Sequence, residues 1–192
     1  MGEKVFTDIG DRKQLHELLP LPGIETQLFN QCKVLEDRIK NKQFIHPEKW
    51  TPANTRKAIK DITGQKPDHM IETRKHDPGP HYKGLYAWVD GKGEVQYVGI
   101  SQNLDTRIPH HVTQKNRSIA TWAYIMSKHN ANGVDIKIPG SYDFKDREKY
   151  QAQIRDHYRC TVVLESNDYL LYMLEAYASI CFRAYWNLFH TH

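Results

Sequence analysis

Apolar residues recur at three- and four-residue steps in the first part of the chain, which is the period of a helix with one buried face. One such stripe predicts a helix over residues 24–42; its members are Leu28, Cys32, Leu35 and Ile39. A shorter helix is predicted over residues 12–19. A third should begin after Thr51 as the N-cap, with a proline at its first position, and end at Gly64. Residues 65–82 carry three prolines and are predicted to form a linker.

Beyond residue 80 the pattern changes to short strands and turns. Residues 83–90 and 94–100 are apolar runs at hairpin spacing, separated by a turn of aspartate and glycine. Residues 158–165 are rich in β-branched side chains and predict a third strand.

Four helices are predicted around these strands: from Asn103 onward, and over residues 118–130, 144–158 and 166–187. Pro109 should kink the first of them or mark a short first helix. The many charges of 144–158 predict a solvated surface helix, whereas 166–187 has a wide apolar face and should be the central buried helix.

The order β-β-α-α-α-β-α predicts an α+β fold, a small three-stranded, mainly antiparallel sheet flanked by helices. We expect two parts. Residues 1–80 form an N-terminal helical segment and linker packed on the core, and residues 81–192 form the functional domain, with an insertion at about 112–157.

Composition and net charge add little about the function. A chain of 192 residues with a net charge of +4 is compatible with a polyanionic partner without identifying one. The three cysteines are widely spaced, and Cys181 lies in an apolar helical pattern, so we expect buried free thiols in a reducing compartment. No apolar run approaches the ~20 residues of a membrane span, and we predict a cytoplasmic protein.

Several polar residues lie where strands and helices could bring them together. Tyr86 and Tyr97 are on neighbouring strands of the hairpin, and Arg107 and His111 share one helix face. Glu175 interrupts an apolar helix, so its carboxylate needs a metal, an arginine or water. Phosphodiester hydrolysis requires such a set: a base for water, positive charge on the phosphorane, and stabilisation of the departing 3′ oxygen.

The order of these features resembles the GIY-YIG nuclease superfamily. Gly-Leu-Tyr is followed after ten residues by Tyr-Val-Gly, then by an arginine and a histidine four apart, a helical glutamate, and Asn187 twelve residues later. The resemblance covers residues 84–187. It implies an α+β nuclease fold and a metal-dependent phosphodiesterase. Pro109 and the length of the 112–157 segment depart from the compact family pattern.

The resemblance also implies roles for six residues. Tyr86 would activate the attacking water, with Tyr97 positioning water or phosphate beside it. Arg107 would contact the scissile phosphate, and His111 would either assist Tyr86 or bind phosphate. Glu175 would be the single ligand of Mg²⁺, with Mn²⁺ as a substitute. The sixth residue, Asn187, would order the site from behind, although it could equally be a simple helix C-cap.

The function that follows is a metal-dependent DNA endonuclease acting on double-stranded DNA, and most specifically a type II restriction endonuclease. Such an enzyme would work as a homodimer when it cuts both strands, with a cognate DNA methyltransferase encoded nearby. The alternatives are a homing-, phage- or repair-type nicking endonuclease, and a catalytically silent DNA-binding module. A basic edge would face DNA phosphates or solvent; it consists of His110, Lys115 and Arg117.

Overall fold

A three-stranded antiparallel sheet forms the centre of the computed structural model, which describes residues 21–46, 49–70, 80–115, 121–130 and 146–187. Strand β3 (Gly84–Val89) lies between β4 (Val95–Ser101) and β5 (Arg159–Leu164), and every residue of β3 is buried. The predicted strands and their antiparallel pairing are confirmed. The predicted helix over residues 12–19 lies outside the described residues.

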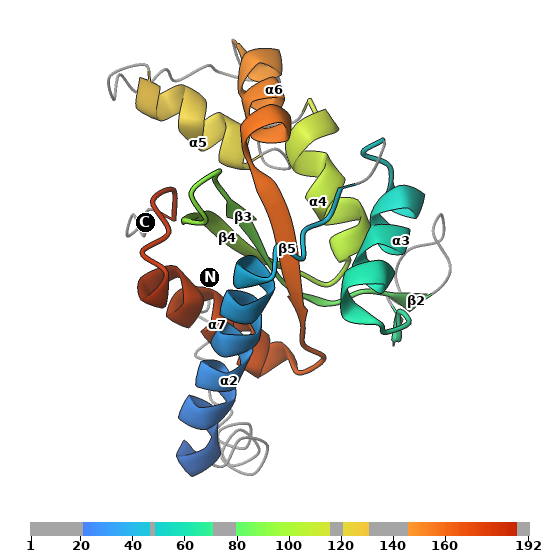
Figure 1. Cartoon of the computed structure of the whole chain (residues 1–192), viewed down its shortest axis with the longest axis vertical. Coiled ribbons are helices and arrows are strands. Elements are labelled where there is room, and N and C mark those ends of the chain that lie inside the picture. Colours follow the sequence, from blue (N-terminus) through green and yellow to red (C-terminus); the bar gives the residue numbers. More distant parts are fainter. Residues whose placement is uncertain (1–20, 47–48, 71–79, 116–120, 131–145, 188–192) are drawn as a thin grey trace, which may run out of the picture.

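Helices cover both faces of this sheet (Figure 1). On one face, α2 (Leu21–Lys40) and α7 (Asp168–Cys181) pack against the side chains of Leu85, Ala87 and Val89. The alternate side chains of β3, Tyr86 and Trp88, point to the opposite face and enter a second core. That core is built by α4 (Leu104–Thr113), α5 (Thr121–Asn130) and α6 (Arg147–His157). The α+β fold predicted from the sequence is therefore observed.

Helix α3 (Pro52–Thr63) shows the predicted end signals. Thr51 Oγ1 accepts a hydrogen bond from the Asn54 amide at 3.3 Å, and Gly64 closes the helix in the left-handed conformation with φ 70°. Ile59 of α3 reaches the core on the α4 face. The predicted linker contains a short ladder, in which β1 (His69–Met70) pairs with β2 (Pro80–His81).

Three predictions about the helices need correction. The charged helix α6 is not fully solvated, because Tyr150, Gln151 and Ile154 are buried against α4 and α5. Helix α7 is not central and ends at Cys181, whose thiol is exposed rather than buried. The wide apolar face of α7 overestimates its burial, because one side of the helix carries exposed apolar residues: Tyr169, Tyr172, Met173 and Ile180.

Helix α4 runs through Pro109 without ending there. Its N-cap, Asn103, accepts a hydrogen bond from the Thr106 amide at 3.0 Å, and the helix continues to Thr113. Arg107 and His111 therefore stay one helical turn apart. None of the helices in the described part of the chain combines the length and apolar character needed to cross a membrane.

Candidate active site

Four of the predicted site residues meet on the α4 face of the sheet. The phenol oxygen of Tyr86 lies 2.7 Å from His111 Nε2 and accepts a hydrogen bond from Arg107 Nε at 3.3 Å. The rings of Tyr86 and Tyr97 have centroids 6.2 Å apart, and Tyr97 interacts with both Tyr86 and Arg107. Strands β3 and β4 and helix α4 thus assemble one hydrogen-bonded cluster, the tyrosine cluster, consisting of Tyr86, Tyr97, Arg107 and His111.

The register of the hairpin explains this convergence. Tyr86 is paired with Gly99, and Tyr97 is paired with Trp88, so the two tyrosines are diagonal neighbours on the same face of the sheet. The ring of Tyr86 lies directly over Gly99. A Cβ atom added at Gly99 would overlap the phenol oxygen, which requires glycine at this position of β4.

Burial keeps the proton-carrying groups of the cluster neutral. Tyr86 is 1% exposed and His111 is 0% exposed. Burial raises the pKa of Tyr86, although the positive charge of Arg107 opposes this shift. Burial also lowers the pKa of His111, and the charge of Arg107 lowers it further. At neutral pH the Tyr86 hydroxyl can therefore donate to a neutral His111.

Arg107 supplies the positive charge of the cluster. Its Nη2 donates to Thr121 Oγ1 on α5 at 3.3 Å while its Nε donates to Tyr86 Oη on β3, so contacts from a helix and a strand hold the guanidinium. Arg107 remains half-buried, whereas Tyr86 and His111 are fully buried. A ligand would therefore meet the guanidinium before either of the other two side chains.

Glu175 approaches from α7, on the other face of the sheet, and is also half-buried. Burial raises the pKa of its carboxyl group, while the charge of Arg107 and the Ile100 amide oppose the shift. In the described ranges, no group of three or more histidine, cysteine, aspartate or glutamate side chains could hold a metal. A single partly exposed carboxylate fits Mg²⁺, which commonly keeps several waters and takes further oxygens from substrate phosphate.

Asn187 lies behind the cluster, at the free edge of β4. Its side-chain Oδ1 accepts from the Val98 amide at 2.7 Å, and its Nδ2 donates to the Val98 carbonyl at 2.8 Å. The amide side chain thereby replaces a neighbouring strand beside the residue that follows Tyr97. Asn187 therefore holds the edge of β4 at Val98.

The predicted basic edge is only partly described. His110 is half-buried and Lys115 is exposed at the end of α4. Arg117 lies outside the described residues.

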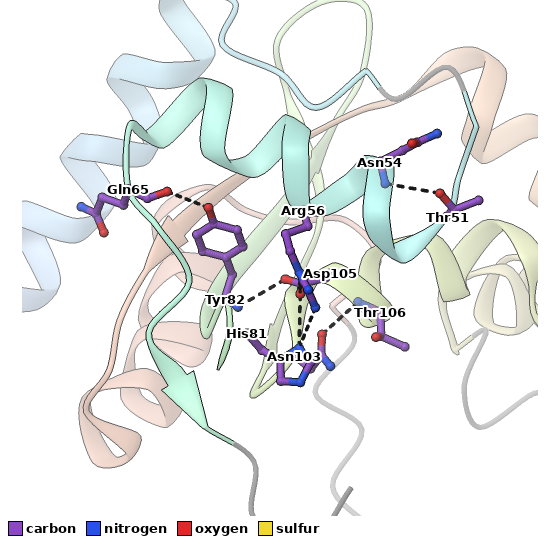
Figure 2. Close-up of polar contacts among 9 residues, drawn as sticks. All are labelled: Thr51, Asn54, Arg56, Gln65, His81, Tyr82, Asn103, Asp105 and Thr106. Carbon is purple, nitrogen blue, oxygen red and sulfur yellow. Dashed lines mark hydrogen bonds and ion pairs between the residues drawn. The ribbon is translucent and has the colours of Figure 1, made fainter. Parts of the chain in front are cut away.

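Sequence reasoning missed a second polar cluster on α4, which Figure 2 shows. Asp105 is 0% exposed, and its Oδ2 accepts from Arg56 Nε at 2.7 Å and lies 3.3 Å from His81 Nδ1. Its Oδ1 accepts from the Tyr82 amide at 3.2 Å. We call Arg56, His81 and Asp105 the aspartate cluster. It ties α3 and β2 to the first turn of α4, two residues before Arg107.

The aspartate in the first turn of α4 gave little sequence signal, because acidic residues are common at helix N-termini for their favourable interaction with the helix dipole. Only the fold reveals that Asp105 is buried and paired with Arg56, which is 49 positions away in the chain.

The segment that holds the hairpin and α4 can be compared with known families. Residues 82–150 match the GIY-YIG catalytic domain. The four members of the tyrosine cluster lie inside this match, and Glu175 and Asn187 lie beyond it. The predicted resemblance to this catalytic domain is confirmed for that segment.

One curated relative extends the comparison. The chain is 32% identical over 100 residues to UvrABC system protein C of Mycoplasma pneumoniae. The aligned region is 50% of this chain and 16% of that protein, so the chain spans only a small part of the relative's length. No solved structure matches the chain. Neither match is to a restriction endonuclease.

Proposed function

We propose that this protein is a divalent-metal-dependent endonuclease that hydrolyses phosphodiester bonds of double-stranded DNA. The observation that carries the proposal is the hydrogen-bonded Tyr86–His111–Arg107 group inside the segment that matches the GIY-YIG catalytic domain. Glu175 adds the carboxylate that such a reaction needs for a metal.

In this mechanism Tyr86 and His111 share the work of removing a proton from water. The raised pKa of Tyr86 disfavours a standing phenolate, so the phenol should pass its own proton to His111 Nε2 as it accepts one from the attacking water. The 2.7 Å separation of the two atoms allows this transfer. Arg107 meanwhile lies where the positive charge of its guanidinium can stabilise negative charge on the phosphorane.

Glu175 would hold the metal. Mg²⁺, or Mn²⁺ in its place, would supply positive charge to the departing 3′ oxygen. The half-buried Glu175 carboxylate lies within the electrostatic reach of Arg107. Asn187 would act by holding β4, and through it Tyr97, in position.

The type of nuclease is a finer proposal. We favour a type II restriction endonuclease for two reasons. The histidine at position 111 resembles that of restriction members of the superfamily. Helices α5 and α6 pack beside α4 and enlarge the core, and they could supply surfaces for base recognition. One such site cuts one strand, so double-strand cleavage would require a homodimer. The similarity to UvrABC system protein C favours the alternative, a repair-type nicking enzyme.

A metal-titrated cleavage assay tests the proposal. Supercoiled plasmid and genomic DNA are incubated with the protein and Mg²⁺ or Mn²⁺. Discrete genomic fragments would support restriction, and nicked plasmid without fragments would support the repair-type alternative. No cleavage with either metal would contradict the nuclease proposal and leave a silent binding module.

A matched pair of variants tests the metal site. Glu175→Ala should abolish cleavage while DNA binding in the absence of metal persists. Glu25→Ala, which removes the same side chain from an exposed position of α2, should cleave like the wild type. Cleavage at the wild-type rate by Glu175→Ala would remove Glu175 from the site.

A further inference from the structure

Two adjoining clefts surround the turn between β3 and β4, away from the tyrosine cluster. One has a volume of about 780 Å³ and the other about 600 Å³, and both are lined by Ile39, Lys40 and Gly93. The two clefts are therefore neighbours, and we call them together the turn groove. Volumes of this size are typical of sites that enclose a small ligand or part of a larger one.

The larger cleft has aromatic walls. Its aromatic lining residues are Tyr158, Phe182, Tyr185 and Trp186. Tyr185 is 55% exposed and packs edge-on against Trp186, with ring centroids 5.0 Å apart. The Trp186 amide donates to the Gln96 carbonyl at 2.9 Å, which fixes this aromatic pair beside β4. Aromatic rings held in this way can stack on nucleobases, whatever their sequence.

The smaller cleft is lined by cations. Lys42, Lys92 and Arg159 reach it from three separate segments, and none of them forms an ion pair with another described residue. Lys40, by contrast, is paired with Glu36.

The Asp90 carboxylate of the smaller cleft accepts hydrogen bonds from the chain itself. Asp90 Oδ1 accepts from the Lys92 and Glu94 amides at 2.9 and 3.0 Å, and its Oδ2 accepts from Gln96 Nε2 at 3.0 Å. These bonds close the turn, and Lys92 forms no ion pair with a described residue. The cleft therefore presents an excess of positive charge suited to phosphate.

Strand β4 connects the turn groove with the tyrosine cluster. Strand β4 lines the groove at Gln96 and passes the cluster at Gly99 and Ile100. At ~3.3 Å per residue, four residues of strand span ~13 Å. This distance corresponds to about four nucleotides at the ~3.4 Å rise of one DNA strand.

We propose that the turn groove binds a single-stranded stretch of nucleic acid that flanks the cleaved bond. Bases stack against Tyr185 and its aromatic neighbours, and phosphates contact Lys42, Lys92 and Arg159. The inference rests on the proposed nuclease function for its position beside the cleaved bond. The combination of stacking surface and cationic track is what single strands require, whereas duplex bases are stacked on one another and unavailable.

The first test measures how much Lys42, Lys92 and Arg159 contribute to the binding of single-stranded DNA. Binding of the full chain to fluorescein-labelled oligodeoxythymidine is followed by anisotropy in EDTA, over a series of KCl concentrations. A triple variant, Lys42→Gln, Lys92→Gln and Arg159→Gln, should bind more weakly and lower the slope of log K against log[KCl] by about 2. A control with the same loss of charge at exposed helix positions outside the groove, Lys33→Gln, Lys57→Gln and Lys60→Gln, should retain the wild-type slope.

The second test measures stacking. The wild type should bind oligodeoxythymidine about 5-fold or more tightly than an abasic oligomer of equal length. Tyr185→Ala should lose much of this preference. Tyr172→Ala removes a similarly exposed tyrosine from α7 outside the groove and should keep it.

The outcomes separate this inference from the nuclease proposal. If the wild type cleaves DNA with Mg²⁺ but the groove variants bind like their controls, the groove assignment is overturned and the nuclease stands. If the wild type cleaves nothing and the groove variants still lose single-strand binding, the groove is supported as a binding site and the nuclease proposal falls. Preference for a duplex probe that is unaffected by Tyr185→Ala would overturn the single-strand assignment.

Discussion

Helix α4 contributes residues to both the aspartate cluster and the tyrosine cluster, which differ in how their charge is balanced. In the aspartate cluster, Asp105 neutralises Arg56 and both of its oxygens have partners. In the tyrosine cluster, Arg107 contacts a phenol, and His111 Nδ1 has no hydrogen-bond partner among the described residues. The first arrangement is complete without a ligand, as a structural support requires. In the second, the Arg107 guanidinium contacts the neutral phenol of Tyr86, and its positive charge suits the cluster to bind a phosphate.

The largest expected effect comes from removing one oxygen from the tyrosine cluster. Tyr86→Phe deletes the atom between His111 and Arg107, and we expect cleavage to slow by about 10² to 10⁴-fold, the usual contribution of a positioned proton acceptor. Single-turnover cleavage of a plasmid measures this rate. Tyr82→Phe, which loses a hydroxyl bonded to the Gln65 carbonyl beside the aspartate cluster, is the control and should cleave normally. Equal rates for both variants would make Tyr86 a packing residue.

The second prediction concerns the aspartate cluster, whose loss should affect stability more than cleavage. Asp105→Asn removes the carboxylate charge that Arg56 contacts at 2.7 Å, and we expect the free energy of unfolding to fall by about 2 to 3 kcal/mol, less than for a fully enclosed pair because Arg56 is 36% exposed. Urea denaturation measures the loss. The cleavage rate per folded molecule should change much less than in Tyr86→Phe. Asp156→Asn, at an exposed position of α6, should leave stability unchanged. A stable but inactive Asp105→Asn protein would place Asp105 in the chemistry.

The two clusters also differ in how far the sequence predicted them. Tyr86, Tyr97, Arg107 and His111 were identified because hairpin and helix spacing are local properties, and the motif order supplied the rest. The aspartate cluster joins residues 56, 81 and 105, which only the packing of α3 against α4 brings together. A single buried aspartate has no periodic signature.

In the fold, too, the features set by local sequence were predicted, whereas those set by tertiary packing were not. Strands, caps and the antiparallel sheet follow from alternation and turn residues, and they were predicted well. The burial of α6 and the exposure of one side of α7 depend on which elements lie next to them, which the chain alone does not specify. Glu175 was singled out by its apolar surroundings, but its position near Arg107 required the tertiary structure.

A smaller effect should follow from shifting the tyrosine cluster without removing any polar group. In Gly99→Ala the new methyl group would overlap the Tyr86 phenol, so the ring must move away from His111 and Arg107. We expect a loss of about 1 to 3 kcal/mol in unfolding free energy, together with slower cleavage. Gly91→Ala, where an added Cβ has open space, is the matched control and should behave like the wild type. Unchanged cleavage by Gly99→Ala would show that the placement of Tyr86 over β4 is not critical.

The smallest effect concerns the pH dependence of stability. Burial lowers the pKa of His111 in the folded protein, so below about pH 6.5 the unfolded chain binds a proton at this histidine that the native state does not. Stability must therefore fall as the pH falls through that value, by at most about 1.4 kcal/mol per pH unit for this group. Urea denaturation between mildly acidic and neutral pH should show a steeper loss in the wild type than in His111→Gln, which cannot titrate. Parallel curves for the two proteins would mean that His111 binds a proton equally well in the folded and unfolded states, and burial would then not lower its pKa.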